Sequence, residues 1–425
     1  MSGDVAELRR AARLLGGILG SLGFGVTVHP LGGEGGPPLV HAERVASGAT
    51  HSVLIYGPYD VQPASRADGW ATDPFDPVVR DGVLRCRGAN DAKGQLVCHV
   101  AAIRALLETE DDVPLTIRIV LDPQEEIGSP LLAPFVRANP DLFRSDLCLI
   151  ADGESIHPTR PQVVLGNRGL LHVRAHVRTA PADVHSGTYG GVMPNAAHRM
   201  VRFLASLMAA DGSIAIRGFH DNVRPPSPAE IAALDALPPG PMPLADHALA
   251  DPARPASRER WRRLMFHPTL DVSGLAAGHA APGVKAIIPA EATANVGFRL
   301  VADQEPETIL RLLRAHASEA GFPDIAIEPV TVFHPLRAST DGAHHRLVTD
   351  ALGRAFGEPP VVIPINPGSN PNTLWASLGT PPIEMSFCGS GGGAHGVDEH
   401  MPLDRIRRGT IACAAILHGI ARDGD

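Results

Sequence analysis

A chain of 425 residues exceeds what one hydrophobic core usually holds, so we expect two domains. With 44% apolar and 20% charged residues, the composition is that of an ordinary soluble globular protein. A formal net charge of -9 argues against nucleic acid or an anionic membrane surface as the main partner.

Residues 1–20 carry charges and predict an amphipathic helix rather than a secretory signal. No uninterrupted apolar run reaches about 18 residues, so we expect no membrane-spanning segment. The five cysteines are scattered and lack a zinc-type pairing such as C-x-x-C, which favours reduced thiols in a cytoplasmic protein.

The first part of the chain alternates strand and helix patterns, which is typical of an α/β domain. The runs 51–57, 115–123 and 147–152 are continuously apolar and are bounded by turn residues. Such runs favour central strands of a parallel sheet that is covered on both faces. A helix is expected to begin near Asp91, between the first two runs.

The middle of the chain predicts a different unit. A strand at 169–179, a helix at 194–210, two strands within 284–301, a helix at 305–321 and a strand at 323–332 follow one another. The order β-α-β-β-α-β is that of the ferredoxin-like split unit. A proline-rich insertion at about 212–284 separates its halves, and connections of this length usually carry function or form an interface.

The C-terminal part returns to the first pattern, with a strand at 381–389 and a closing helix at 403–422. We therefore expect one α/β domain made of residues 1–165 and 337–425, with a lid domain of residues 166–336 inserted between these two pieces.

Acidic residues gather where the predicted strands end, and in open α/β sheets ligands bind outside the carboxyl ends of the strands. Each has a simpler explanation when taken alone, such as a helix cap, a turn or a solvated helix start. Together at one edge they would repel one another unless a cation neutralised them. Mixed carboxylate and imidazole donors suit Zn²⁺, with Mn²⁺ or Co²⁺ as alternatives. These residues are Asp60, Glu125 and Glu126, Asp152, Asp91 at the helix start, and His395 on the glycine-rich loop 388–396.

An ordered series of motifs resembles the zinc aminoacylase/carboxypeptidase metallopeptidases, particularly their carnosinase-like dipeptidases, over nearly the whole chain. The resemblance implies a mixed-sheet catalytic domain, a ferredoxin-like lid and a homodimer formed through that lid. It also implies metal-dependent hydrolysis of the amide bond of a dipeptide or N-acyl amino acid. The motifs are YGPYDVQPA (56–64), WATDPFDPVVRDGVLRCRGANDAKGQ (70–95), PQEEIGSP (123–130), LIADGE (149–154), VHSGTYGG (184–191) and GSGGGAHGVDEHMP (389–402).

The resemblance also implies a role for each metal-site residue. Asp91 would bridge two metal ions, Glu126 and His395 would complete one site, and Asp152 would serve the other. Glu125 would be the general base that takes a proton from the attacking water and later gives it to the leaving amine.

Further roles are implied around the metals. Asp60 would orient the site from outside the ligand set. His185 would stabilise the oxyanion, reaching a neighbouring subunit's site from the lid. The forked guanidinium of Arg299 would hold a substrate carboxylate together with the Gly368-Ser369 loop.

Two positions depart from the family's pattern. Pro58 stands where the family has a metal-binding histidine, and Asn366 lies where relatives usually carry a basic residue. Three possibilities follow: one metal ion bound by the complete site suffices for hydrolysis, His51 or Tyr59 replaces the missing ligand, or the fold has been redirected. Redirected chemistry would be amide formation, another biosynthetic step, or ligand binding alone. One or two metal ions per chain are therefore expected.

Overall fold

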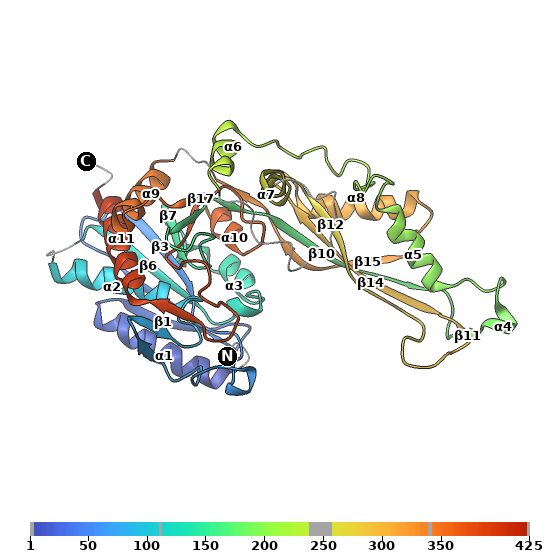
Figure 1. Cartoon of the computed structure of the whole chain (residues 1–425), viewed down its shortest axis with the longest axis horizontal. Helices are drawn as coiled ribbons and strands as arrows, with labels where there is room; N and C mark the ends of the chain where they lie inside the picture. Colours follow the sequence, from blue (N-terminus) through green and yellow to red (C-terminus); the bar gives the residue numbers. More distant parts are fainter. Residues whose placement is uncertain (1–3, 110–112, 238–256, 339–341, 423–425) are drawn as a thin grey trace.

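The computed structural model describes residues 4–109, 113–237, 257–338 and 342–422. A larger body and a slender one follow each other along the long axis and give an elongated molecule (Figure 1). None of the described helices combines the length and the apolar character that crossing a membrane requires.

The larger body is built on an eight-stranded sheet. The three apolar runs and the C-terminal run form its central strands, which pair in parallel as expected and are largely buried. In sheet order the strands are β1 (Gly25–Pro30), β2 (Pro38–Arg44), β6 (Leu115–Asp122), β3 (His51–Pro58), β7 (Leu147–Ala151), β18 (Pro382–Ser386), β8 (Gln162–Val164) and β17 (Val361–Ile363).

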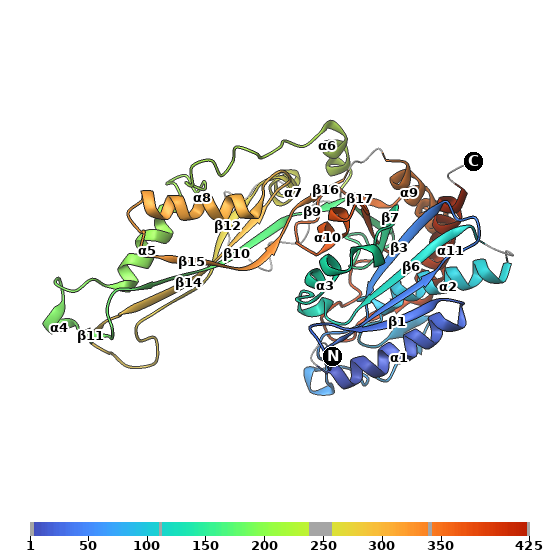
Figure 2. The same cartoon turned by 180° about the vertical axis from the view of Figure 1, so that it is seen from behind.

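Helices cover both faces of this sheet, so the predicted α/β class is confirmed (Figures 1 and 2). One face packs into a core with α1 (Val5–Ser21), α2 (Lys93–Thr109), α9 (Ala343–Phe356) and α11 (Leu403–Arg422). The other face packs with α3 (Leu132–Ala138) and α10 (Asn372–Ser377) around Trp375. Because both faces are buried, the central strands consist of continuous rather than alternating apolar residues.

A small three-stranded sheet joins distant parts of the chain beside the larger one. Its strands are β4 (Val78–Arg80), β5 (Val83–Arg85) and β19 (His400–Pro402). The pairing of β19 with β5 places the glycine-rich loop next to the segment that leads into α2. Short 3-10 turns complete the body at η1 (Arg66–Asp68), η2 (Glu125–Ile127) and η3 (Pro140–Leu142).

The slender body has the expected ferredoxin-like arrangement, with one correction. Its sheet has the order β12 (Thr269–Ala277), β14 (Glu291–Leu300), β10 (Gly169–Arg178) and β15 (Ala326–Phe333), and it carries α5 (Ala196–Ser206) and α8 (Pro306–Glu319). The edge strand β12 comes from the expected insertion. The segment 284–290 contributes only β13 (Ile287–Ile288), which pairs with β11 (Val184–His185) at the tip beside α4 (Ser186–Tyr189).

The two bodies join through short paired strands, β9 (Gly166–Asn167) and β16 (Leu336–Arg337), visible in the view from behind (Figure 2). Two helices of the insertion, α6 (Pro228–Asp235) and α7 (Ser257–Phe266), pack on the edge strand β17 of the larger body. Glu230 of α6 forms a buried ion pair with Arg337 of β16. These insertion helices thus form an interface within the chain, while residues 238–256 of the proline-rich stretch lie outside the described residues.

Candidate metal centre

Three side chains converge at the carboxyl edge of the large sheet. One ligand atom from each of Asp91, Glu126 and His395 lies within 4.8 Å of the others. His395 Nε2 is 3.0 Å from Asp91 Oδ2 and 2.9 Å from Glu126 Oε2. Parallel strands bring their carboxyl ends to one edge, which explains why residues so distant in sequence meet there.

Asp152 lies next to Asp91, and a hydrogen bond joins their side chains. Burial raises the pKa of Asp91, and this hydrogen bond opposes the rise. Burial and the neighbouring carboxylates, Asp91 first, raise the pKa of Asp152 well above its ordinary value. Asp91 is therefore in contact both with His395 and with Asp152.

The electrostatics of this cluster fit a divalent cation. Burial, followed by the charges of Glu126 and Asp91, raises the pKa of Glu125 to about 8. Burial, followed by the charge of Asp91, also raises the pKa of Glu126. Burial and mutual repulsion therefore disfavour the charged form of several carboxyls that surround one imidazole. Carboxylate and imidazole groups arranged in this way are a donor set that Zn²⁺ and similar ions bind.

The resemblance implies a histidine at position 58, and the structure brings neither of the two candidate replacements to the cluster. Pro58 ends β3 opposite Asp122 and has no donor atom. Tyr59 is buried, and its hydroxyl donates a hydrogen bond to the Pro38 carbonyl. His51 begins β3 at the end opposite to Pro58. Neither residue reaches the cluster.

Asp60 supports the glutamates rather than joining the three-residue cluster. Its Oδ1 accepts a hydrogen bond from the Glu125 N–H at 3.1 Å, and its Oδ2 accepts one from the Glu126 N–H at 3.2 Å. Gln62 Nε2 donates to Glu126 Oε2 at 3.0 Å. These contacts fix the turn that presents Glu126 to His395.

Glu399 is a supporting residue that sequence reasoning missed. Its side chain is fully buried and accepts hydrogen bonds from three successive parts of the loop before α2, namely the N–H groups of Gly88, Asn90 and Asp91. Arg87 Nη1 donates to the same carboxylate at 2.8 Å. Glu399 comes four residues after His395, just beyond the glycine-rich loop, so it holds the two loops that carry Asp91 and His395 against each other.

Lys93, one of two lysines in the chain, was also missed. Its Nζ donates to the carbonyls of Tyr59 and Asp60 at 3.2 Å. Burial lowers the pKa of Lys93, and the nearby carboxylates, Asp60 first, oppose that change. The ammonium group thus offsets part of the negative charge of the cluster from its buried side.

The predicted carboxylate-binding residues meet at the junction of the two bodies. Arg299 Nη1 donates to Ser369 Oγ at 2.8 Å, and the Gly368 N–H donates to Asn366 Oδ1 at 2.9 Å. A second arginine, Arg168, donates through Nε to the Pro367 carbonyl, and its buried Nη1 has no hydrogen-bond partner in the described parts of the chain. Burial and the charge of Arg299 lower the pKa of Arg168 to about 10. Two neighbouring guanidinium groups, one of which has an N–H without a described partner, suit an anion.

His185 is not part of this cluster. It belongs to β11, at the tip of the slender body farthest from the larger body (Figure 1). Its side chain is exposed, and Nδ1 accepts a hydrogen bond from the Gly187 N–H at 3.0 Å. Within one chain, His185 and the metal cluster are therefore far apart.

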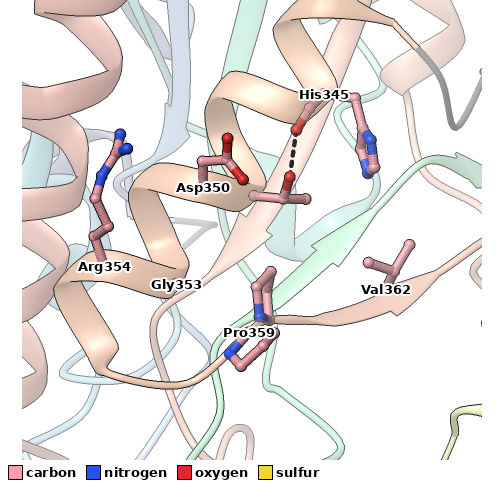
Figure 3. A pocket seen from close by; sticks show the side chains of 8 residues that line it. His345, Asp350, Gly353, Arg354, Pro359 and Val362 are labelled. Carbon is pink, nitrogen blue, oxygen red and sulfur yellow. Dashed lines mark hydrogen bonds between the residues drawn. The ribbon is translucent and has the colours of Figure 1, made fainter.

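A groove of about 510 Å³ lies elsewhere, between α9 and the segment that leads into β17 (Figure 3). Its lining includes His345, Asp350, Arg354, Pro359 and Val362. None of the metal-cluster residues lines this groove, so it does not belong to the candidate centre.

This chain is similar to known proteins both in sequence and in architecture. The chain is 29% identical over 401 residues to the Cys-Gly metallodipeptidase dug1 of Schizosaccharomyces pombe, covering 91% of this chain and 83% of that protein. It is 29% identical to the Beta-Ala-His dipeptidase of Homo sapiens, covering 77% of this chain and 66% of that protein. The M20 family metallo-carboxypeptidase Sso-CP2 from Sulfolobus solfataricus has 26% identity and a TM-score of 0.85, covering 97% and 94% of the two chains.

These similarities confirm the resemblance to carnosinase-like dipeptidases. Residues 54–419 match the profile of the family described as Peptidase family M20/M25/M40. Since this match spans most of the chain, the protein belongs to the peptidase family M20/M25/M40.

Proposed function

We propose that the protein is a metal-dependent dipeptidase whose centre is the Asp91–Glu126–His395 cluster. The single observation that carries the proposal is the meeting of these three ligand atoms within 4.8 Å beside Glu125. The relatives named as metallodipeptidases support the same reaction class. A bound divalent ion would polarise the scissile carbonyl and make water more acidic.

Glu125 would serve as the proton carrier. Its carboxylate makes no hydrogen bond to the described residues, whereas Glu126 next to it is tied to Gln62 and His395. A raised pKa suits a group that must take a proton from water and then give it to the leaving amine near neutral pH. Asp60 would hold both glutamates in register for these steps.

The substrate carboxylate would lie against Arg299 and the Gly368-Ser369 loop, with Arg168 as an additional donor. Asn366 shapes this loop through its bond to the Gly368 N–H. Such a site favours small peptide-like substrates with a free carboxylate at the leaving-group side.

His185 would act on the centre of a partner subunit. Its place at the tip supports this, because the tip is the part of the chain farthest from its own cluster (Figure 1). The proposed assembly is a homodimer formed through the lid, residues 166–336, in the cytoplasm. Each site would then combine the proton carrier of one subunit with the oxyanion donor of the other.

Pro58 leads us to propose one tightly held ion per chain, Zn²⁺ in the first place and Mn²⁺ or Co²⁺ as alternatives. Three protein ligands with an open position are a common arrangement for catalytic zinc. Among the residues that the structure describes, no group of three close potential ligands includes Asp152.

The test combines metal analysis with a dipeptide panel. We expect about one equivalent of metal per chain after dialysis, and hydrolysis of at least one dipeptide that is abolished by chelation and restored by the ion. Pro58→His should raise the metal content toward a second equivalent. A protein that holds no metal and cleaves no dipeptide or N-acyl amino acid would contradict the proposal and favour redirected chemistry.

A further inference from the structure

Glu384 is a buried carboxylate that the reaction described above leaves without a role. It lies on β18, and only 9% of its surface is exposed. Burial raises its pKa. No lysine or arginine forms an ion pair with it among the residues that the structure describes. A buried acid without a cationic partner is costly and requires a reason.

The two oxygens of Glu384 have different surroundings. Oε2 accepts hydrogen bonds from Asn372 Nδ2 at 2.7 Å and Asn370 Nδ2 at 2.9 Å. The Asn370 side-chain oxygen accepts from the Asn372 N–H, which turns the Asn370 amide group toward Glu384. For Oε1, no donor is present in the described parts of the chain. The side chain is thus held firmly through one oxygen, and the other is left open.

The open oxygen lies near the Asp152-Gly153 turn, and the charge of Glu384 acts on Asp152. In the sheet register Glu384 is opposite Ile150, two residues before Asp152, on the strand next to β7. A Cβ added to Gly153 would lie 4.0 Å from Glu384 Oε1. Gly153 cannot satisfy this oxygen, because its N–H donates to Asp152 Oδ1 and its carbonyl accepts from Gln95 and Ser386.

The same loop links Glu384 to the proposed carboxylate site. Residues 366–372 present Ser369 to Arg299, and then present Asn370 and Asn372 to Glu384. Consecutive residues of one short loop, Ser369 and Asn370, therefore contact the guanidinium of Arg299 and the carboxylate of Glu384, and Glu384 lies near Asp152. That polarity matches a zwitterion with its negative group at Arg299 and its positive group at Glu384.

We propose that Glu384, oriented by Asn370 and Asn372, binds the free ammonium group of the substrate and so selects dipeptides over N-acyl amino acids. This rests on the proposed function and sharpens its substrate class. A protonated amine supplies the donors that Oε1 lacks, and a charge-assisted hydrogen bond in a buried site discriminates strongly against an analogue without the donor.

Glycyl-alanine and N-acetylalanine provide a matched pair, since they differ only by the ammonium group. Binding is measured by calorimetry in the metal-loaded Glu125→Gln protein, with and without Glu384→Gln, so that the result does not depend on turnover. We expect glycyl-alanine to bind at least about 10-fold more tightly than N-acetylalanine, and Glu384→Gln to remove most of that preference. The control Glu328→Gln, an exposed acid on the lid, should leave the preference unchanged.

Metal content, measured by elemental analysis, separates the alternatives. If Glu384→Gln lost one equivalent of metal, Glu384 would be a metal ligand and the proposal would be overturned. Equal affinity of the parent protein for glycyl-alanine and N-acetylalanine would overturn it as well. Asn370→Ala removes one of the two amide donors and should weaken the preference partly. This variant keeps the proposal testable if Glu384→Gln does not fold. If the protein prefers glycyl-alanine in the binding experiment but the wild type hydrolyses no dipeptide, the proposed function would be contradicted while this subsite would be supported.

Discussion

Glu125 and Glu126 are neighbours in sequence, yet their carboxylates have different surroundings. Glu126 contacts His395 and Gln62, whereas burial and the charges of neighbouring acids, Glu126 first, raise the pKa of Glu125 to about 8. The short turn η2 makes adjacent side chains diverge, so one can hold an ion while the other exchanges protons. The two residues should therefore fail in different ways when they are changed.

Glu125→Gln should lower kcat by about 10²- to 10⁴-fold, because the amide cannot accept a proton, while metal content stays at the wild-type level. Glu126→Gln should instead lower the metal content, because a ligand oxygen is lost. Steady-state kinetics together with elemental analysis distinguishes the two outcomes. Metal loss in Glu125→Gln, with full metal in Glu126→Gln, would mean that the two roles are reversed.

The acids of the cluster also predict how stability depends on pH. Without a cation, the pKa of Glu125 rises from its ordinary value of 4.5 to about 8 in the folded protein. A carboxyl with a raised folded pKa stabilises the protein below its unfolded pKa, and this stability is lost as pH rises toward the folded value. Asp91, Glu126 and Asp152 shift in the same direction.

We therefore expect metal to raise the melting temperature more at pH 8 than at pH 5.5, since the ion offsets a repulsion that grows over this range. Paired thermal unfolding curves, with chelator and with saturating Zn²⁺, give the difference directly and cancel effects of other titrating groups. A metal-induced shift that stays constant or shrinks as pH rises would argue against this cluster as the binding site.

At the scale of secondary-structure elements, the centre depends on two loops that meet only because β19 pairs with β5. Glu399 lies at that meeting point and is hydrogen-bonded to the backbone of the Asp91 loop and to Arg87. Its contribution is therefore structural and acts on the geometry of Asp91 and His395 rather than on the reacting atoms.

Glu399→Gln should reduce the unfolding free energy by about 3 kcal/mol, because it leaves the buried Arg87 guanidinium without its counter-charge. It should also weaken metal affinity by about 10- to 100-fold, as expected for a residue that positions ligands. Urea unfolding and competition with a metal indicator measure these effects. The exposed Glu7 of the Glu7–Arg10 pair is the matched control, and Glu7→Gln should change neither quantity.

The elements differ in how far the sequence could predict them. The strands that end near Asp60, Glu125 and Asp152 were predictable because burial on both faces requires continuous apolar runs. The edge strand β12 was not, since its pattern is mostly exposed and it lies in a proline-rich region. Glu399 and Glu384 were missed for a related reason: their importance comes from partners far away in sequence, which a local pattern does not reveal.

Over the whole molecule, the metal cluster and His185 lie in different bodies. The junction is short, being formed by β9 and β16, and the Glu230–Arg337 ion pair ties α6 to it. The tip that carries His185 projects away from the larger body in both views (Figures 1 and 2). A single chain in this arrangement supplies the proton carrier without the proposed oxyanion donor.

This separation predicts complementation between two inactive variants. His185→Ala keeps Glu125, and Glu125→Gln keeps His185, so a dimer containing one of each has one site with both groups intact. Random reassociation after mixing should give about half mixed dimers and recover about a quarter of wild-type activity. The mixture is assayed against each variant alone at the same total concentration. If His185 acted within its own chain, every site in the mixture would lack one group, and the mixture would be no more active than its components.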